Sequence, residues 1–254
     1  MAWDPKVYLK FADHRLRPAA ELLARISLEA PKRVVDLGCG PGNVTALLTE
    51  RWPSAKLIGV DNSQPMLDAA AKSGVAAEWV MADIDSYAPP ERFDVIYSNA
   101  ALHWVPNHHR LFPRLCGLLA PGGVLAVQMP HNEHRPLQRL VETMVDEKGL
   151  RSRLPVHRDL VGDPEGYFDI LAPHVAAIDI WEVDYLQILT GENPAVEWAK
   201  GSSLRPVMTA LEGRERESFL DEYAERLRSA YKRSADGRTL FPFRRLFILA
   251  QAAA

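Results

Sequence analysis

The segment from residue 33 to residue 42 constrains this chain more than any other part of its sequence. Arg33–Leu37 is an apolar run whose pattern predicts a buried parallel strand. The strand is followed by glycines at alternate positions, which are Gly38, Gly40 and Gly42. Asn43–Arg51 then has the pattern of a helix. A strand, a glycine-rich turn and a helix N-terminus together form a cradle for a nucleotide-like ligand in an α/β sheet.

The spacing of the glycines narrows the kind of ligand. A dinucleotide fingerprint has the order G-x-G-x-x-G directly after the strand, whereas this chain has G-x-G-x-G preceded by Asp36. The run from Asp36 to Gly42 resembles motif I of the class I S-adenosylmethionine-dependent methyltransferases. The resemblance implies a Rossmann-like fold, S-adenosyl-L-methionine as the methyl donor and S-adenosyl-L-homocysteine as the product. A dehydrogenase is the weakest alternative, because the final glycine is not at the required spacing.

Hydrophobic patterning predicts how the rest of the chain is organised. Six further strands are predicted, over Lys56–Val60, Glu78–Met81, Phe93–Ser98, Val124–Gln128, Ala177–Leu189 and Leu240–Ala250. The helices predicted around them are Pro18–Leu28, Gln64–Lys72, Asn107–Leu119, Asn132–Lys148, Pro194–Lys200 and Arg214–Lys232. This alternation predicts a parallel sheet with helices on both faces. The resemblance adds that the sheet has seven strands, of which the last is antiparallel.

The second half of the chain departs from simple alternation. Two long insertions, at about residues 130–176 and 190–238, separate the last predicted strands. We expect them to form a helical cap within a single methyltransferase domain over residues 1–254. The stretch 150–173 is rich in proline, glycine, arginine and aspartate, which predicts irregular structure or short helices.

The composition argues against several other classes of protein. A chain of 254 residues, 47% of them hydrophobic, can bury one large core. The formal net charge of −3 argues against a nucleic-acid partner. Two cysteines, Cys39 and Cys116, are too few for a disulfide framework or a cysteine zinc site, so we expect reduced thiols, no metal and a cytoplasmic protein. No run approaches the roughly 20 apolar residues of a membrane span, and the sequence assigns no oligomeric state.

Asp61 is the candidate for the ribose of the cofactor. It follows the strand Lys56–Val60 and lies roughly 20 residues after Gly42, the offset expected of a ribose-binding acid in such folds. The alternative is an acid that caps the helix that follows. Asn62 and Met66 would then lie near the ribose and the adenine, although Met66 could equally be a core residue.

The ends of the third and fourth strands supply more candidates for cofactor binding. In the motif Ala82-Asp83-Ile84 the resemblance implies that Asp83 accepts from the adenine amino group and that Ile84 packs on the ring. Asp85 is the rival acid, and a turn-forming role is the alternative for Asp83. After the fourth strand, the resemblance implies that backbone carbonyls of Asn99 and Ala100 hold the methionyl amino group.

Further candidates concern the methionyl end of the cofactor and the chemistry. Asp36 and the backbone of Gly38 would hold the positively charged amino end, unless Asp36 is only structural. Tyr8 and Arg15 belong to an N-terminal segment that resembles an aromatic lid and would contact the methionyl carboxylate. An aromatic stripe in a core helix is the alternative for that segment. His103 could act as a general base or as a packing residue.

Several segments outside these shared motifs make the resemblance more specific and extend it over nearly the whole chain. They are Trp3-Asp4-Pro5, Tyr97–Trp104, Val127–Pro130, Trp198–Gly201, Leu204–Pro206 and Phe241–Phe247. In these segments the chain resembles a family of bacterial methyltransferases that esterify trans-aconitate, a small tricarboxylate. The resemblance implies a carboxyl O-methyltransferase that forms a monomethyl ester. Residues 150–174 have no counterpart in the resemblance.

A carboxylate acceptor fits elementary chemistry. A carboxylate is already ionised at pH 7, so its methylation needs orientation and partial desolvation rather than a general base. The other carboxylates need cationic partners, for which arginine is suited by its bidentate geometry. Arg205 and Arg245 are the strongest candidates, joined by Lys200 and Trp104 from the same segments. For each cation alone, a solvated surface charge is the alternative.

Other functions remain open from the sequence. One is methylation of another carboxyl group, such as a malonyl thioester on acyl-carrier protein, which would need a basic docking patch. A second is methylation of a small phenol or quinone, for which His103 would matter as a base. A third is a module that binds the cofactor without catalysis.

Overall fold

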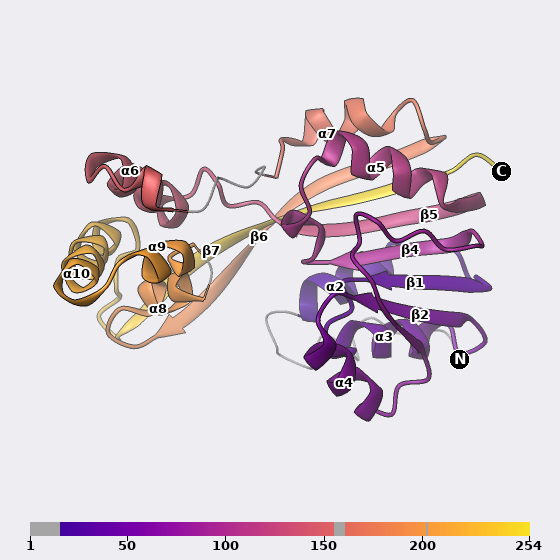
Figure 1. The fold of residues 1–254 in the computed structure, drawn as a ribbon, viewed down its shortest axis with the longest axis horizontal. Helices are drawn as coiled ribbons and strands as arrows, with labels where there is room; N and C mark the ends of the chain where they lie inside the picture. Colours follow the sequence, from indigo (N-terminus) through magenta and orange to yellow (C-terminus); the bar gives the residue numbers. More distant parts are fainter. Residues whose placement is uncertain (1–15, 155–160, 202) are drawn as a thin grey trace. The chain divides into compact units, whose positions relative to one another are not determined.

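A seven-stranded sheet organises the protein, with the strand order β3-β2-β1-β4-β5-β7-β6 (Figure 1). The computed structural model describes residues 16–154, 161–201 and 203–254. The strands are β1 (Arg33–Leu37), β2 (Lys56–Asp61), β3 (Glu78–Met81), β4 (Phe93–Asn99), β5 (Leu119–Pro130), β6 (Ala177–Thr190) and β7 (Arg238–Gln251). The first five strands pair in parallel, and β7 runs antiparallel to β5. The predicted Rossmann-like α/β fold, mostly parallel with an antiparallel last strand, is confirmed.

The order of the strands reverses between β1 and β4. From β1 the chain proceeds outward through β2 to β3, and it then returns to place β4 on the other side of β1. Because these strands are parallel, their carboxyl ends meet at one edge of the sheet. In open α/β sheets, ligands bind outside this edge at the point of reversal.

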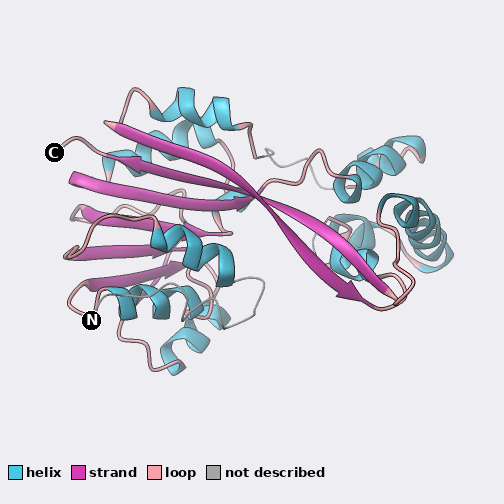
Figure 2. Ribbon diagram, turned by 180° about the vertical axis from the view of Figure 1, so that it is seen from behind, coloured by secondary structure: helices cyan, strands magenta, loops and turns pink. Residues whose placement is uncertain are grey.

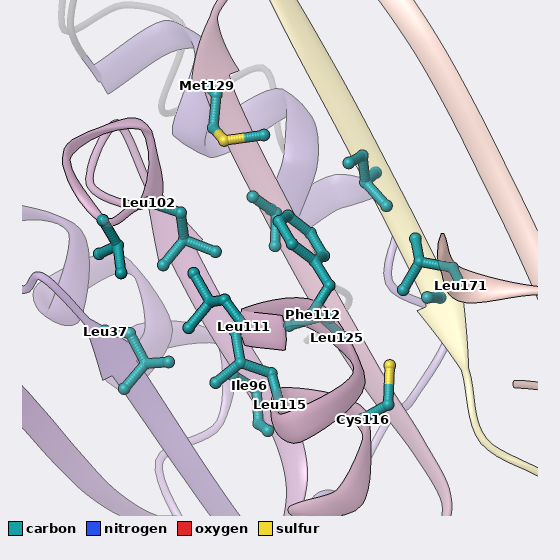
Figure 3. Close-up of a cluster of buried hydrophobic side chains, with 14 of the residues drawn as sticks. Leu37, Ile96, Leu102, Leu111, Phe112, Leu115, Cys116, Leu125, Met129 and Leu171 are labelled. Carbon is teal, nitrogen blue, oxygen red and sulfur yellow. The ribbon is translucent and has the colours of Figure 1, made fainter. Parts of the chain in front are cut away.

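Helices from residues 16–117 and 164–171 cover both faces of the sheet. They are α2 (Leu16–Ala24), α3 (Asn43–Arg51), α4 (Gln64–Lys72), the 3₁₀ turn η1 (Leu102–Trp104), α5 (His108–Gly117) and α7 (Pro164–Leu171). Successive residues of a strand point to opposite faces. Ile96 of β4 packs into a core with Leu111 of α5 and Leu171 of α7 (Figure 3). Its neighbour Tyr97 points the other way and donates from its hydroxyl to the Ala19 carbonyl of α2 at 2.7 Å.

The described residues divide into two compact units. The first draws on Met1–Pro130, Val161–Glu182 and Arg245–Ala254, and the second on His131–Leu160 and Val183–Arg244. Strands β6 and β7 contribute residues to both units (Figure 2). The predicted insertions, at about residues 130–176 and 190–238, correspond to the segments between β5 and β6 and between β6 and β7. The single domain with a helical cap stays a prediction.

The second unit has a hydrophobic core of its own. Its helical elements are α6 (Pro136–Glu147), the 3₁₀ turn η2 (Arg151–Arg153), α8 (Pro194–Lys200), α9 (Arg205–Ala210) and α10 (Gly213–Ala230). Met144 of α6, Phe219 of α10 and Phe241 of β7 are buried in this core. The buried Tyr223 hydroxyl also donates to the Leu137 carbonyl at 2.7 Å, which joins α10 to α6.

The main error of the sequence analysis in the sheet concerns β5. The sequence Pro121-Gly122-Gly123 was expected to separate a helix from a strand beginning at Val124, but β5 already begins at Leu119. The register explains this, because Phe93 pairs with Leu119 whereas Val95 pairs with Val124. The strand therefore bulges at the glycines and continues. Helix α9 was also missed, and α7 lies in a stretch for which irregular structure or short helices were expected.

Candidate cofactor and acceptor site

The glycine loop after β1 is held in a conformation that suits glycine. Gly38, Gly40 and Gly42 have φ values of 76°, 54° and 86°, in the left-handed region. A Cβ atom built on Gly38 would lie 2.2 Å from the Cβ atom of Ala101. The loop after β1 therefore touches the loop after β4, and only a residue without a side chain fits between them.

Asp61 connects the end of β2 to this loop. The Gly40 N–H donates to Asp61 Oδ2 at 2.9 Å, and the Ser63 N–H donates to Oδ1 at 2.9 Å. The N-cap of α4 is Ser63, so Asp61 is not itself the capping residue. Each carboxylate oxygen has about two lone pairs, so both oxygens can accept a further hydrogen bond from a ligand. The ribose-binding role of Asp61 stays a prediction.

Asp36 is buried beneath the loop at 1% exposure. Its Oδ2 accepts a hydrogen bond from the Thr45 hydroxyl of α3 at 2.7 Å. Burial raises the pKa of Asp36 to about 7, with the Thr45 hydrogen bond opposing the shift and the nearby charge of Asp61 adding to it. Thr45 was not identified from the sequence, since a threonine in the first turn of a helix has many possible roles. The contact of Asp36 with a methionyl amino group stays a prediction.

The residues after β3 form a turn around Asp83. Asp83 Oδ1 accepts from the Asp85 N–H at 2.9 Å, and Oδ2 lies 3.5 Å from the Asn62 side-chain nitrogen. The rival acid, Asp85, forms an ion pair with Arg110 at 3.0 Å. Ile84 extends toward the glycine loop, where its Cδ1 atom would lie 3.7 Å from a Cβ on Gly38. The adenine-binding roles of Asn62, Asp83 and Ile84 stay predictions.

The exposure of Met66 decides between the two interpretations that the sequence left open for it. Its side chain is on α4 and is 45% exposed. The interpretation of Met66 as a core residue is therefore wrong, and its predicted contact with the adenosine stays a prediction.

The end of β4 presents polar groups and a strained backbone. Ala100 has a φ of 54°, a conformation that costs a residue with a Cβ atom about 1–2 kcal/mol. Its N–H donates to the Gln128 carbonyl of β5 at 2.8 Å, which helps to hold it there. The Asn99 side-chain oxygen Oδ1 is buried and accepts no hydrogen bond within the described ranges. Such a group suits a ligand that donates hydrogen bonds. The sequence analysis assigned the methionyl amino group to the backbone carbonyls of Asn99 and Ala100 instead, and that role stays a prediction.

His103 and Trp104 follow in the 3₁₀ turn η1. Their rings lie 4.7 Å apart between centroids and are inclined by 42°. Trp104 is 56% exposed. The base role of His103 and the acceptor-binding role of Trp104 stay predictions.

Arg245 is buried beside β5 with an exposure of 6%. It lies opposite Pro130, at the same edge as the ends of the parallel strands. Its Nη1 donates to Gln128 Oε1 at 3.1 Å. A solvated surface charge is therefore the wrong interpretation for Arg245. Gln128 belongs to the segment Val127–Pro130 that carries the resemblance, but a glutamine inside a strand has no distinctive spacing that would predict its role.

The other predicted cations belong to the second unit. Lys200 pairs with Glu197 at 2.7 Å on α8, and the exposed Arg205 begins α9. Arg244, the neighbour of Arg245 in sequence, is held by Asp184, which accepts hydrogen bonds from both Arg244 and Arg135. The pKa of Asp184 is lowered to about 2, chiefly by the bond from Arg244. The acceptor-binding roles of Lys200 and Arg205 stay predictions. Tyr8 and Arg15 lie outside the described residues.

The part of the chain that the structure describes holds neither a metal-binding cluster nor a membrane-spanning helix. No group of three or more histidine, cysteine, aspartate or glutamate side chains in residues 16–154, 161–201 and 203–254 is arranged to hold a metal ion. Over the same ranges, no helix is both long and apolar enough to span a membrane.

A glycine loop, an acid at the end of β2 and a polar end of β4 at one sheet edge define a methyltransferase of the Rossmann-like type. Comparison with known proteins agrees. Residues 8–160 match a family described as a methyltransferase domain. Curated relatives named trans-aconitate 2-methyltransferase include those of Azoarcus sp. (44% identical, 98% of this chain and 98% of that protein) and Rhodococcus jostii (46%, 98% and 99%). The chain therefore belongs to the methyltransferase-domain family and, within it, to the group of proteins named trans-aconitate 2-methyltransferase.

Solved structures show the same fold at much lower identity. The YcgJ protein from Bacillus subtilis matches with a TM-score of 0.62 and 15% identity, covering 93% of this chain and 98% of that one. A phosphoethanolamine N-methyltransferase 2 from Haemonchus contortus, solved with S-adenosylhomocysteine, matches with a TM-score of 0.59 and 17% identity, covering 93% and 52%.

Proposed function

We propose that this protein transfers the methyl group of S-adenosylmethionine to a carboxylate oxygen of trans-aconitate and so forms a monomethyl ester. Full-length identity of 44–46% to relatives that carry this activity in their name supports the choice of substrate. Buried Arg245 at the ligand-binding edge of the sheet is the structural observation that carries the choice of a carboxylate.

The residues at the sheet edge fit the cofactor. The three left-handed glycines let a ligand approach the backbone, and Asp61 retains acceptor capacity for two ribose hydroxyls. Asn99 Oδ1, which accepts no hydrogen bond from the described residues, suits an ammonium group. Asp83 and Ile84 would hold the adenine, beside the exposed Met66. When bound, S-adenosylmethionine supplies a methyl group on a positively charged sulfur, which a carboxylate can accept directly.

The protein's task in such a transfer is to position the acceptor and partly dehydrate it. The acceptor carboxylate is ionised at pH 7, so no side chain has to remove a proton. Arg245 can bind a carboxylate that does not react, with two parallel hydrogen bonds that fix the orientation of the molecule. Charge is neutralised as the ester and thioether form, so a site drier than water favours the reaction. Lys200, Arg205 and Trp104 stay candidates for further contacts with the acceptor.

We also propose a cytoplasmic location. Cys39 and Cys116 are both free and buried, as expected of a protein in a reducing compartment. Burial raises the pKa of the Cys116 thiol to about 11, so this thiol is un-ionised and unreactive at neutral pH.

The test is methyl transfer from labelled S-adenosylmethionine to a panel of acceptors. The panel holds trans-aconitate, cis-aconitate, citrate, isocitrate, a malonyl-carrier protein and a catechol. We expect trans-aconitate to give the dominant signal and a base-labile product, as an ester must. Transfer to the catechol alone would instead favour a phenol methyltransferase with His103 as the base.

A further inference from the structure

Gln128 lies inside the sheet with none of its surface exposed. It pairs with Asn99 of β4 on one side and with Phe247 of β7 on the other. The alternation of side chains places Gln128 on the same face as Asn99 and Tyr97, which is the face that α2 covers. A polar side chain at such a position must have its hydrogen bonds satisfied by specific partners.

The hydrogen bond from Arg245 fixes the orientation of the Gln128 side-chain amide. A guanidinium group donates hydrogen bonds and accepts none, so the amide oxygen Oε1 must face it. The amide nitrogen Nε2, with its two N–H groups, therefore points elsewhere. It is buried and donates to no acceptor among residues 16–154, 161–201 and 203–254.

The neighbouring strand carries a group of opposite character. Asn99 Oδ1 is a buried acceptor that receives no hydrogen bond from the described residues, and Asn99 is the register partner of Gln128. The strand ends thus offer an acceptor on β4 and donors on β5 and β7. The first suits a cationic group and the second suits an anionic group.

We propose that Gln128 is a specificity residue that donates from Nε2 to a non-reacting carboxylate of the acceptor. Gln128 and Arg245 then form one carboxylate-binding pair, in which the Gln128 oxygen also fixes the orientation of the guanidinium. This inference rests on the proposed function and names the side chains that recognise the acceptor's charge.

The strand order indicates why this carboxylate belongs to the acceptor. The predicted cofactor contacts run from Asp83 after β3, through Asp61 at the end of β2 and the loop after β1, to Asn99 at the end of β4. Gln128 and Arg245 lie beyond β4, on β5 and β7. A group that they bind is therefore on the far side of the methionyl end from the adenosine.

Two substitutions at Gln128 distinguish a hydrogen bond from Nε2 to the acceptor from a role limited to orienting the Arg245 side chain. Gln128→Met keeps the approximate volume but removes both hydrogen bonds. Gln128→Glu keeps an oxygen for Arg245 but replaces the donor by a negative charge. We expect Gln128→Met to raise the KM for trans-aconitate about ten- to hundred-fold, and Gln128→Glu to raise it further, while the Kd for S-adenosylhomocysteine changes less than three-fold. If Gln128 only supports Arg245, Gln128→Glu restores the wild-type KM, and that result overturns the proposal.

Calorimetry with S-adenosylhomocysteine tests the assignment to the acceptor, because this product carries the cofactor's own carboxylate. A Kd that rises as much as the acceptor KM in Gln128→Met would place the pair on the cofactor and overturn the proposal. Gln251→Met, near the opposite end of β7, is the matched control and should change neither constant. Gln128→Asn withdraws the amide by one methylene and should give an intermediate KM; it replaces Gln128→Met if that variant does not fold.

A binding experiment keeps this proposal distinct from the proposed function. A wild-type enzyme that does not methylate trans-aconitate refutes the function. The pair is then tested by calorimetric titration of propane-1,2,3-tricarboxylate into the S-adenosylhomocysteine complex. Binding that weakens at least ten-fold in Gln128→Met supports the pair, whereas equal binding, or none by the wild type, overturns it.

Discussion

At the scale of single residues, Asp61 is the side chain on which most of the cofactor assignment depends. Its two oxygens hold the Gly40 and Ser63 N–H groups, so it both shapes the loop and offers further acceptor capacity. We expect Asp61→Ala to weaken binding of S-adenosylhomocysteine at least ten-fold, measured by calorimetry, since hydrogen bonds to a charged group each contribute about 1.5–3 kcal/mol. Asp68→Ala, an exposed acid on α4, is the control. An unchanged affinity in Asp61→Ala would end the ribose assignment.

Asp36 gives the molecule a pH dependence whose sign follows from its burial. The folded-state pKa of about 7 exceeds the unfolded value near 4. Between these pH values the folded protein holds a proton that the unfolded chain has released, so the free energy of unfolding falls as pH rises from about 4 to about 7. Urea unfolding of Asp36→Asn should lack this fall, which amounts to a few kcal/mol in the wild type. An offset between the two proteins that stays the same across this range would contradict the burial argument; Asp68→Asn is the control.

At the scale of elements, the glycine loop and the loop after β4 depend on each other. Gly38 and Gly74 have nearly equal φ values, 76° and 78°. Among the described residues, a Cβ atom on Gly38 would strike Ala101, whereas one on Gly74 would meet nothing within 4 Å. Gly74→Ala should cost about 1–2 kcal/mol of stability for its backbone conformation alone. Gly38→Ala should cost clearly more, and Ala101→Gly in the same chain should recover part of that difference, as measured by urea unfolding. Equal losses at the two glycines would mean that the contact is unimportant.

The elements also show how far a sequence can predict such a fold. The bounds of β1, α3, α4, β3 and α8 agree with the prediction to the residue, because apolar periodicity and turn residues act locally there. The start of β5 could not be predicted, because a bulge opposite Phe93 depends on the neighbouring strand. The site residues also divide into those that the sequence could predict and those that it could not. Spacing in the sequence pointed to Asp61, whereas the Thr45 partner of Asp36 and the Gln128 partner of Arg245 come from packing between distant segments.

At the scale of the whole molecule, the two units have separate cores, and all of the cofactor candidates that the structure describes belong to the first unit. We expect Phe219→Ala in the second core to cost about 3–5 kcal/mol and to expose amides of residues 183–244 to hydrogen exchange. S-adenosylhomocysteine should bind this variant with unchanged affinity. Leu171→Ala, in the first core, is the counterpart, and it should instead lower protection around β4 and β5. Loss of cofactor binding in Phe219→Ala would contradict this expectation, because the cofactor candidates would then depend on the core of the second unit.

Arg244 and Arg245 of β7 show how a strand directs two neighbouring side chains of the same type to opposite faces. Leu246 and Ile248 pack in the core of the first unit, whereas Phe247 between them stacks on Trp181. Successive side chains of this strand therefore point to opposite faces of the sheet. Arg244 is neutralised by Asp184, while Arg245 lies against Gln128. A slip of β7 by one residue would exchange these two tasks without changing the composition of the strand. The pairing register of β7 is therefore itself part of what places the Arg245 guanidinium at the sheet edge.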